Sequence, residues 1–132
     1  MDIDIKQVIV IRADLRNSKG EKIRTGKIIA QACHASLSFL TKHLQNGGNF
    51  DNLTEEEKYW VGSIFKKICL KVDSESELIE IHQKSLNAGL KSYLIIDSGL
   101  TEFAGEPTKT CCAIGPHRSD SIDKITGHLK LL

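Results

Sequence analysis

The sequence predicts an α/β fold, a sandwich with helices on both faces of a largely parallel sheet. Strand-like runs alternate with helical patterns along the chain, which is typical of βαβ organisation. Capping motifs also mark the starts of several helices. The chain has 132 residues, of which 40% are hydrophobic and 27% are charged, as in a folded globular domain. This length fits one domain, so we expect a single domain over residues 1–132.

A strand, an exposed loop and a long helix are expected at the start of the chain. Residues 6–12, KQVIVIR, form a run rich in β-branched side chains and predict a buried strand. Residues 14–25 are polar and predict an exposed loop. Thr25 can cap a helix over about residues 26–44, which ends before a pair of glycines.

Two capping-box spacings predict the next two helices. Thr54 followed by Glu57 opens a short helix. Ser74 followed by Glu77 opens another, and Gly89 suits the position just after its end.

Three further strands and a last helix complete the expected elements. Residues 67–72, KICLKV, alternate with the period of a strand. Residues 91–97 and 110–115 are expected as the third and fourth strands. Ser119 or Asp120 can then cap a short final helix.

The composition excludes several classes of protein. The apolar stretches are short and interrupted by charge, so no membrane-spanning helix and no membrane partner are expected. The first residues lack the basic and apolar regions of a secretory signal, so we expect a cytoplasmic protein. Eighteen basic and seventeen acidic residues nearly cancel, which excludes a bulk attraction to nucleic acid.

The four cysteines do not predict a metal site. A zinc site through Cys33, His34, Cys111 or Cys112 is conceivable, but their spacing does not match the known zinc motifs. We therefore expect no metal and interpret the cysteines as small buried apolar side chains in a reducing compartment.

A local basic stretch lies in the expected loop before the long helix. Such a stretch can contact phosphates even on a nearly neutral protein, although a solvated lysine-rich loop would look the same in sequence. The candidate phosphate contacts are Arg16, Lys19, Lys22 and Arg24.

The long helix carries a polar stripe on one face. Lys27, Gln31, His34 and Ser38 follow one another at helical spacing. A lysine in the first turn is unfavourable for the helix itself, because that end already favours anions, and it makes sense if it meets a phosphate or a developing oxyanion. The alternatives are a solvated helix face and, for His34, a partly buried hydrogen-bonded histidine.

A second polar cluster follows the third expected strand. Asp97 closes this strand, Gly99 opens a turn, and Thr101 follows. Ligands of open α/β sheets bind beyond the carboxyl ends of strands, so Asp97 and Thr101 are candidate site residues. A turn or cap is the structural alternative for this aspartate.

Four motifs, in this order, resemble type 2 peptidyl-tRNA hydrolases, the archaeal and eukaryotic family. The resemblance extends from about Gln7 to Leu132 without a large gap. The matching motifs are TGKIIAQACHAS from Thr25, Trp60 ahead of KICLKV, DSGLT from Asp97, and AIGP from Ala113 through IDKITGHLKL.

The resemblance implies a hydrolase that cleaves the ester joining a peptide to the terminal ribose of tRNA. It implies a mixed four-stranded sheet between helices, hence a three-layer α/β/α domain with a mixed, mostly parallel sheet. It also implies tRNA as partner, no metal or organic cofactor, and often a homodimer. The implied site residues are Lys27, Gln31, His34, Asp97 and Thr101.

In the roles we assign, Lys27 stabilises the oxyanion or a nearby phosphate. Asp97 positions or deprotonates the attacking water, and Gln31 and Thr101 hold this water or the ester. His34 is either part of this machinery or a supporting residue.

The chain departs from the family at the aspartate motif, which usually reads D-[AS]-G-R-T-Q. Leu100 replaces the arginine and Glu102 replaces the glutamine, while the preceding basic loop is longer than usual and offers Lys22 or Arg24 for phosphate contacts. The leading hypothesis is peptidyl-tRNA hydrolysis. The alternatives are a non-catalytic RNA- or protein-binding module on the same fold, and a hydrolase for another small ester or amide.

Overall fold

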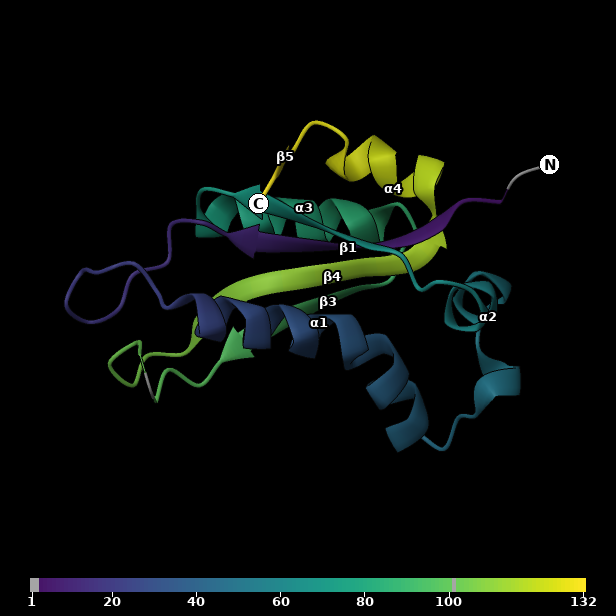
Figure 1. The fold of residues 1–132 in the computed structure, drawn as a ribbon, viewed down its shortest axis with the longest axis horizontal. Helices are drawn as coiled ribbons and strands as arrows, with labels where there is room; N and C mark the ends of the chain where they lie inside the picture. Colours follow the sequence, from purple (N-terminus) through teal and green to yellow (C-terminus); the bar gives the residue numbers. More distant parts are fainter. Residues whose placement is uncertain (1–2, 101) are drawn as a thin grey trace.

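The computed structural model describes residues 3–100 and 102–132, which form a mixed sheet between two layers of helices (Figure 1). The five strands lie in the order β3-β4-β1-β2-β5. Helices α1 and α2 cover one face of the sheet and α3 and α4 the other. The elements are β1 (Ile5–Arg12), α1 (Thr25–Gln45), the 3-10 helix η1 (Phe50–Asn52), α2 (Glu55–Gly62), β2 (Lys67–Val72), α3 (Glu75–Asn87), β3 (Ser92–Asp97), β4 (Thr108–Arg118), α4 (Ser119–Thr126) and β5 (Lys130–Leu131).

The predicted α/β class with a mixed sheet is confirmed, but the sheet differs in detail from the expectation. It has five strands rather than four, because the last residues add β5 beside β2. It is also not mostly parallel, since β1 pairs with β2 in parallel while the pairings β1–β4, β2–β5 and β3–β4 are antiparallel. Among the described residues, no helix lies between β3 and β4, and a connection without a crossover helix returns the chain antiparallel.

The core lies on both faces of the central strand β1, whose residues from Ile5 to Ile11 are all buried. On one face, Val8 and Val10 pack with Leu78 of α3 and Ile122 of α4. On the other face, a second cluster consists of Ile9, Ile11, Ala35, Ile95, Cys111 and Ala113. A strand buried on both faces reads as a continuous apolar run, which is why this strand was predictable.

Helices α2 and α3 begin at the capping residues that the sequence predicts. Thr54 Oγ1 accepts from Glu57 N at 3.1 Å, and Glu57 Oε1 accepts from Thr54 N at 2.9 Å. Ser74 Oγ accepts from Glu77 N at 3.1 Å.

Two expected caps are wrong. The cap of α1 is Arg24 and not Thr25, which is the first helical residue, and Arg24 forms no side-chain capping bond. The cap of α4 is Arg118, because β4 continues directly into this helix, so neither Ser119 nor Asp120 precedes it.

The cysteines are not uniformly buried. Cys111 and Cys112 lie in β4 and are fully buried, as expected, but Cys33 and Cys69 are exposed. Both exposed cysteines line an apolar groove between α1 and β2, where no helix of the described residues covers the sheet. No helix in the described part of the chain is long and apolar enough to cross a membrane.

The topology brings the ends of β1 and β3 and the start of α1 together at one edge of the sheet. Strands β1 and β3 both pair antiparallel to β4, so they run in the same direction and end at the same edge. The loop after β1 leads to the start of α1 at this edge, and the β3–β4 loop lies beside it, on the left in Figure 1. Since α1 packs on β1, β3 and β4, its first turns face the end of β3 and the start of β4.

Candidate active site

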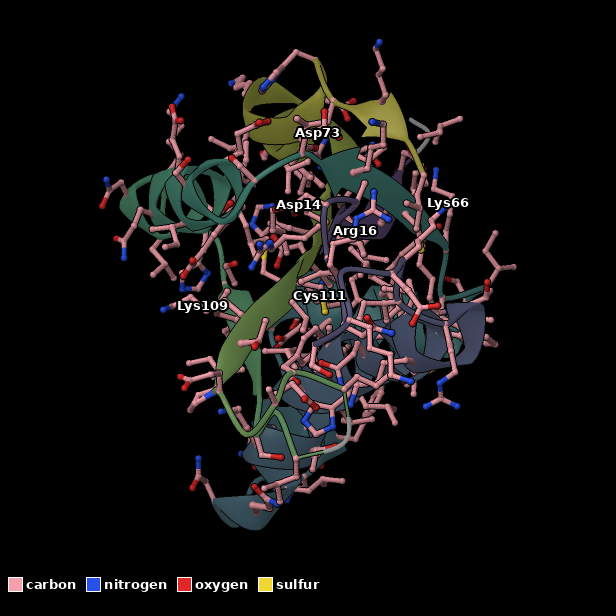
Figure 2. All side chains as sticks on the ribbon, turned by 90° about the vertical axis from the view of Figure 1, so that its left-hand side faces the viewer. Asp14, Arg16, Lys66, Asp73, Lys109 and Cys111 are labelled. Atoms are coloured by element: carbon pink, nitrogen blue, oxygen red, sulfur yellow. The ribbon has the colours of Figure 1, made fainter. Side chains whose placement is uncertain are left out.

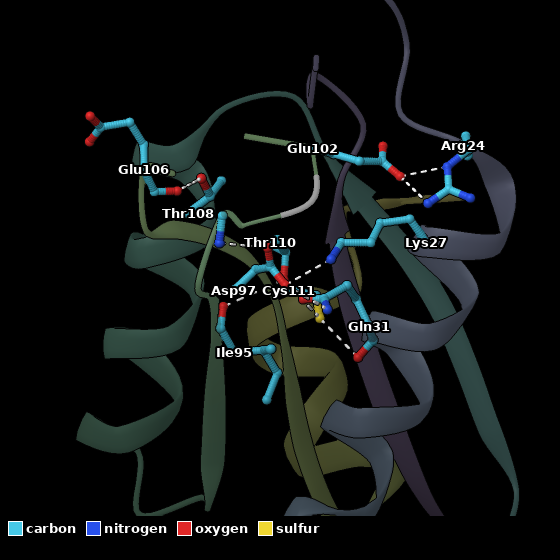
Figure 3. A network of polar contacts seen from close by, with 11 residues as sticks. Arg24, Lys27, Gln31, Ile95, Asp97, Glu102, Glu106, Thr108, Thr110 and Cys111 are labelled. Carbon is cyan, nitrogen blue, oxygen red and sulfur yellow. Dashed lines mark hydrogen bonds and ion pairs between the residues drawn. The ribbon is translucent and has the colours of Figure 1, made fainter. Parts of the chain in front are cut away.

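A lysine–aspartate ion pair lies at this edge of the sheet. Lys27 Nζ, from the first turn of α1, is 2.8 Å from Oδ1 of Asp97, the last residue of β3 (Figure 3). Their side chains are only 14% and 12% exposed. Withdrawing two charges from water costs free energy, so an enclosed pair is weak evidence for stability, and such pairs are frequent in functional sites.

Asp97 remains ionised at neutral pH. The hydrogen bond from Lys27 is the largest effect and lowers the pKa of this carboxyl, while desolvation opposes it. The backbone N–H of Gly99 donates to Asp97 Oδ2 at 2.9 Å and lowers the pKa further. The site therefore holds a fixed ammonium beside a fixed carboxylate.

Gln31 joins the pair one turn further along α1. Its Nε2 donates to Asp97 Oδ1 at 3.4 Å, and its Oε1 accepts from Thr110 Oγ1 at 2.6 Å (Figure 3). Because the ionised carboxylate of Asp97 can only accept, the NH₂ group of Gln31 faces Asp97, and the bond with Thr110 holds the amide in this orientation.

Sequence reasoning missed Thr110, which is 1% exposed and lies at the start of β4. The available signal was a polar residue at the first position of the otherwise apolar strand expected over residues 110–115. Its partner Gln31 lies 79 residues away, so this signal does not identify the contact.

The turn after Asp97 requires glycine. Gly99 has φ +81°, in the left-handed region, and a Cβ there would lie 2.0 Å from the backbone oxygen of Glu106. The loop folds back on itself at this point, since Gly105 N donates to Gly99 O at 2.9 Å. Thr101, a predicted site residue, lies outside the described residues.

His34 is exposed on α1, so its interpretation as a partly buried histidine is wrong. It lines a shallow hollow with other residues of the same helix, and the described polar contacts of Lys27, Gln31 and Asp97 do not include its ring. The structure thus brings together three of the predicted site residues and leaves His34 beside them. Among the described residues, no group of three His, Cys, Asp or Glu side chains is arranged to hold a metal ion.

The basic loop lies at the same end of the molecule, which faces the viewer in Figure 2. Its residues Arg16 and Lys22 form an isolated antiparallel bridge, so the loop is a small hairpin. Leu15 and Ile23 of this loop pack against Phe103 of the β3–β4 loop. The four predicted phosphate contacts, Arg16, Lys19, Lys22 and Arg24, are all exposed.

Comparison with known proteins identifies the family. A sequence model described as "Peptidyl-tRNA hydrolase PTH2" matches residues 5–132. The chain is 41% identical to a peptidyl-tRNA hydrolase of Methanopyrus kandleri, covering 96% of this chain and 97% of that protein. It is 43% identical to one of Methanothermobacter thermautotrophicus, covering 97% and 100%. The chain therefore belongs to the PTH2 family of peptidyl-tRNA hydrolases.

Proposed function

We propose that the protein hydrolyses the ester bond between peptide and tRNA in peptidyl-tRNA and so recycles the tRNA. Family membership over nearly the whole chain supports this activity. The observation that carries the proposal is the contact of Lys27 and Gln31 with Asp97, whose motifs lie about 70 residues apart in sequence.

In the proposed reaction, water adds to the carbonyl carbon of the ester, and the bond to the ribose oxygen then breaks. The products are a peptide with a free carboxyl group and tRNA with a free terminal hydroxyl. Negative charge develops on the carbonyl oxygen as water adds, and the ammonium of Lys27 is the positive group that stabilises it. Because Asp97 already fixes this ammonium at 2.8 Å, little reorganisation is needed.

Asp97 positions the attacking water rather than acting as a strong base. A general base works best with a pKa near the operating pH, whereas the ion pair with Lys27 lowers the pKa of Asp97. A carboxylate held in this way still accepts a hydrogen bond from water and orients it, with the NH₂ group of Gln31 beside it. Thr101 remains in the proposal as a group that holds the water or the ester, and His34 as either a part of this machinery or a supporting residue.

The basic loop supplies the proposed contacts to tRNA. Arg16, Lys19, Lys22 and Arg24 are exposed at the end of the molecule where the Lys27–Asp97 pair lies. Lysine and arginine side chains on an exposed loop fit the phosphate backbone, which positions a nucleic acid without reading its sequence. The substrate ester would then enter from this end.

The two departures from the family pattern do not favour the non-catalytic alternative. The side chain of Leu100 is 82% exposed, so it occupies no place within the polar cluster. Glu102 pairs with Arg24, so its negative charge is compensated locally. Both departures therefore leave the contacts among Lys27, Gln31 and Asp97 in place.

We also propose a cytoplasmic location, a single domain over residues 1–132, and a homodimer. The apolar groove between α1 and β2 has a volume of about 460 Å³ and is lined by Ile29, Leu37 and Leu132, among others. Exposed apolar surface is typical of association sites, so this groove supports the homodimer. Sedimentation equilibrium tests the dimer, and a monomer at micromolar concentration would contradict it.

The release of peptide from purified N-blocked aminoacyl-tRNA tests the proposed activity. We expect the wild-type protein to release the N-blocked amino acid catalytically, and Lys27→Ala to be strongly impaired under the same conditions. Absence of release above background by a folded wild-type sample would contradict the proposal and favour the binding module.

A further inference from the structure

Glu102 makes a contact between two loops that the sequence did not indicate. Its Oε1 accepts from Arg24 Nε at 2.6 Å, and Arg24 Nη2 also faces it (Figure 3). The two residues are 78 positions apart. Glutamate stands here where the family usually has glutamine, so this chain has both a charge and a partner at this position.

The burial of the two partners is unequal. The side chain of Glu102 is 10% exposed, whereas that of Arg24 is 75% exposed. A carboxylate with so little access to water is destabilised when it loses its counter-ion, so Glu102 retains the guanidinium. Arg24 in turn presents most of its surface to solvent.

Glu102 is held in place by the packing of its own loop. Its backbone oxygen accepts from Ser18 N at 3.2 Å, across to the basic loop. The next residue, Phe103, is buried against Leu15 and Ile23 of that loop. The carboxylate is therefore a fixed point, and the arginine is the exposed side chain that it orients.

Arg24 lies one turn before the proposed oxyanion group. Its backbone oxygen accepts from the N–H groups of Lys27 and Ile28 at 3.1 and 3.3 Å. Figure 3 shows the side chains of Arg24 and Lys27 next to each other on the same side of the network. The exposed guanidinium of Arg24 therefore lies near the largely buried Lys27–Asp97 pair.

We propose that Glu102 is a positioning residue that fixes the guanidinium of Arg24 beside the Lys27–Asp97 pair, where Arg24 binds the substrate phosphate nearest the ester. This inference rests on the proposed function. A guanidinium carries five N–H donors, and the contact with Glu102 engages two of its nitrogens. The remaining donors have the planar geometry that binds phosphate oxygens in pairs.

An unfavourable role of Glu102 in substrate binding predicts a different result. If its charge only repels the substrate, or competes with phosphate for Arg24, removing it will strengthen binding. If it positions Arg24, removing it will weaken binding, but only while Arg24 is present. Glu106 provides a matched control, because it is an exposed glutamate of the same loop and its removal changes the net charge equally.

The test is a double-mutant cycle of Glu102→Ala and Arg24→Ala, with Glu106→Ala as control. The substrates are N-blocked aminoacyl-tRNA and the same ester on the terminal trinucleotide alone. We expect Arg24→Ala to raise KM about tenfold on both substrates, because the lost phosphate contact is charge-assisted. Glu102→Ala should raise KM about threefold, as for loss of an ion pair with one solvent-exposed partner, with kcat almost unchanged.

Three further results support the positioning role. Glu102→Ala should add nothing in the Arg24→Ala background, Glu106→Ala should leave KM unchanged or slightly lower it, and Glu102→Gln should recover part of the loss because its amide oxygen accepts the same bonds. A decrease in KM for Glu102→Ala matching that of Glu106→Ala would overturn the inference. So would an equal increase with and without Arg24.

The same cycle measured on the affinity for deacylated tRNA, by fluorescence anisotropy, does not depend on turnover. If the wild-type protein cleaved neither substrate, the proposed function would fail while this binding cycle still tested the coupling between Glu102 and Arg24. Independent effects of the two substitutions on affinity would then overturn the positioning role.

Discussion

The carboxylate of Asp97 has a different set of partners on each oxygen. Oδ1 accepts from Lys27 and Gln31, and Oδ2 accepts from the backbone of Gly99. The hydrogen bonds from Lys27 and from the Gly99 backbone favour the ionised form and outweigh desolvation, so the pKa of Asp97 lies below its ordinary value of 3.8. This environment determines how the reaction and the stability respond to pH.

We expect no titration of Asp97 in the activity profile between about pH 5 and pH 8, because the carboxylate stays ionised there. The pKa of Asp97 is lower in the folded than in the unfolded state. The ion pair therefore stabilises the fold at pH values above the unfolded pKa. This stabilisation is lost as pH falls through the lower folded value. Single-turnover rates and melting temperatures of the wild type and Asp97→Asn test both statements. An acid limb near pH 6.5 that disappears in Asp97→Asn would show instead that Asp97 is a base with a raised pKa.

Thr110 acts on the reaction through Gln31. Its hydroxyl donates to Gln31 Oε1 at 2.6 Å, so Thr110→Val leaves the amide without this orientation while preserving shape. We expect kcat to fall about tenfold, since a displacement of order 1 Å of a positioning group is costly. Thr110→Ser retains the hydroxyl and should keep most of the activity. A Thr110→Val effect of the same size in the Gln31→Ala background would contradict this account.

At the level of elements, local signals were sufficient for most strands and helices. The apolar run of β1, the alternating pattern of β2 and the helix caps at Thr54 and Ser74 depend on residues close in sequence, and the structure has the corresponding elements. The two-residue strand β5 depends on pairing with a distant strand. The pairing of β5 with β2 has no local signature, so four strands were expected. The direction of β4 follows from its connection to β3, which has no helix among the described residues, whereas the alternation of strands and helices elsewhere in the chain favoured a mostly parallel sheet.

The capping box of α2 gives a prediction confined to stability. Thr54→Ala removes the bond to the Glu57 backbone and should lower the free energy of unfolding by about 1 kcal/mol. The helix lies away from the Lys27–Asp97 pair, near the other end of the sheet (Figure 1). We therefore expect unchanged kcat and KM at a temperature well below melting. A loss of activity in the fully folded variant would connect α2 to the site and contradict this separation.

At the scale of the whole molecule, the position of the charged residues matters more than the net charge. The chain carries a net charge of only +1, yet the basic loop sits at the same end as the candidate site. If its side chains bind tRNA phosphates, affinity will fall steeply with salt, because each neutralised phosphate releases counterions.

Lys19→Ala combined with Lys22→Ala should weaken tRNA binding and reduce the slope of log affinity against log salt by about one per lost contact. The matched control is Lys84→Ala with Lys124→Ala, which removes equal charge from α3 and α4 on the opposite face. An unchanged slope for the loop variant, or an equal change for the control, would show that the loop is only solvated.

The candidate site was partly predictable because its motifs are local while its assembly is not. Lys27 and Gln31 share a helix face, and Asp97 ends a strand, so each was a candidate from the sequence alone. The orientation of Gln31 by Thr110 and the pairing of Glu102 with Arg24 arise only when segments about 80 residues apart pack together. Sequence spacing contains no information on such contacts.

The central claim is that Lys27 and Asp97 carry out chemistry and do not serve the fold alone. Single-turnover cleavage of N-blocked aminoacyl-tRNA by Asp97→Asn, with the melting temperature of the same sample, tests it most directly. We predict a rate at least about a hundredfold below wild type, as is typical for loss of one preorganised electrostatic group, with tRNA affinity retained. Normal cleavage by the folded fraction together with a lowered melting temperature would contradict the claim and make Asp97 a structural turn residue.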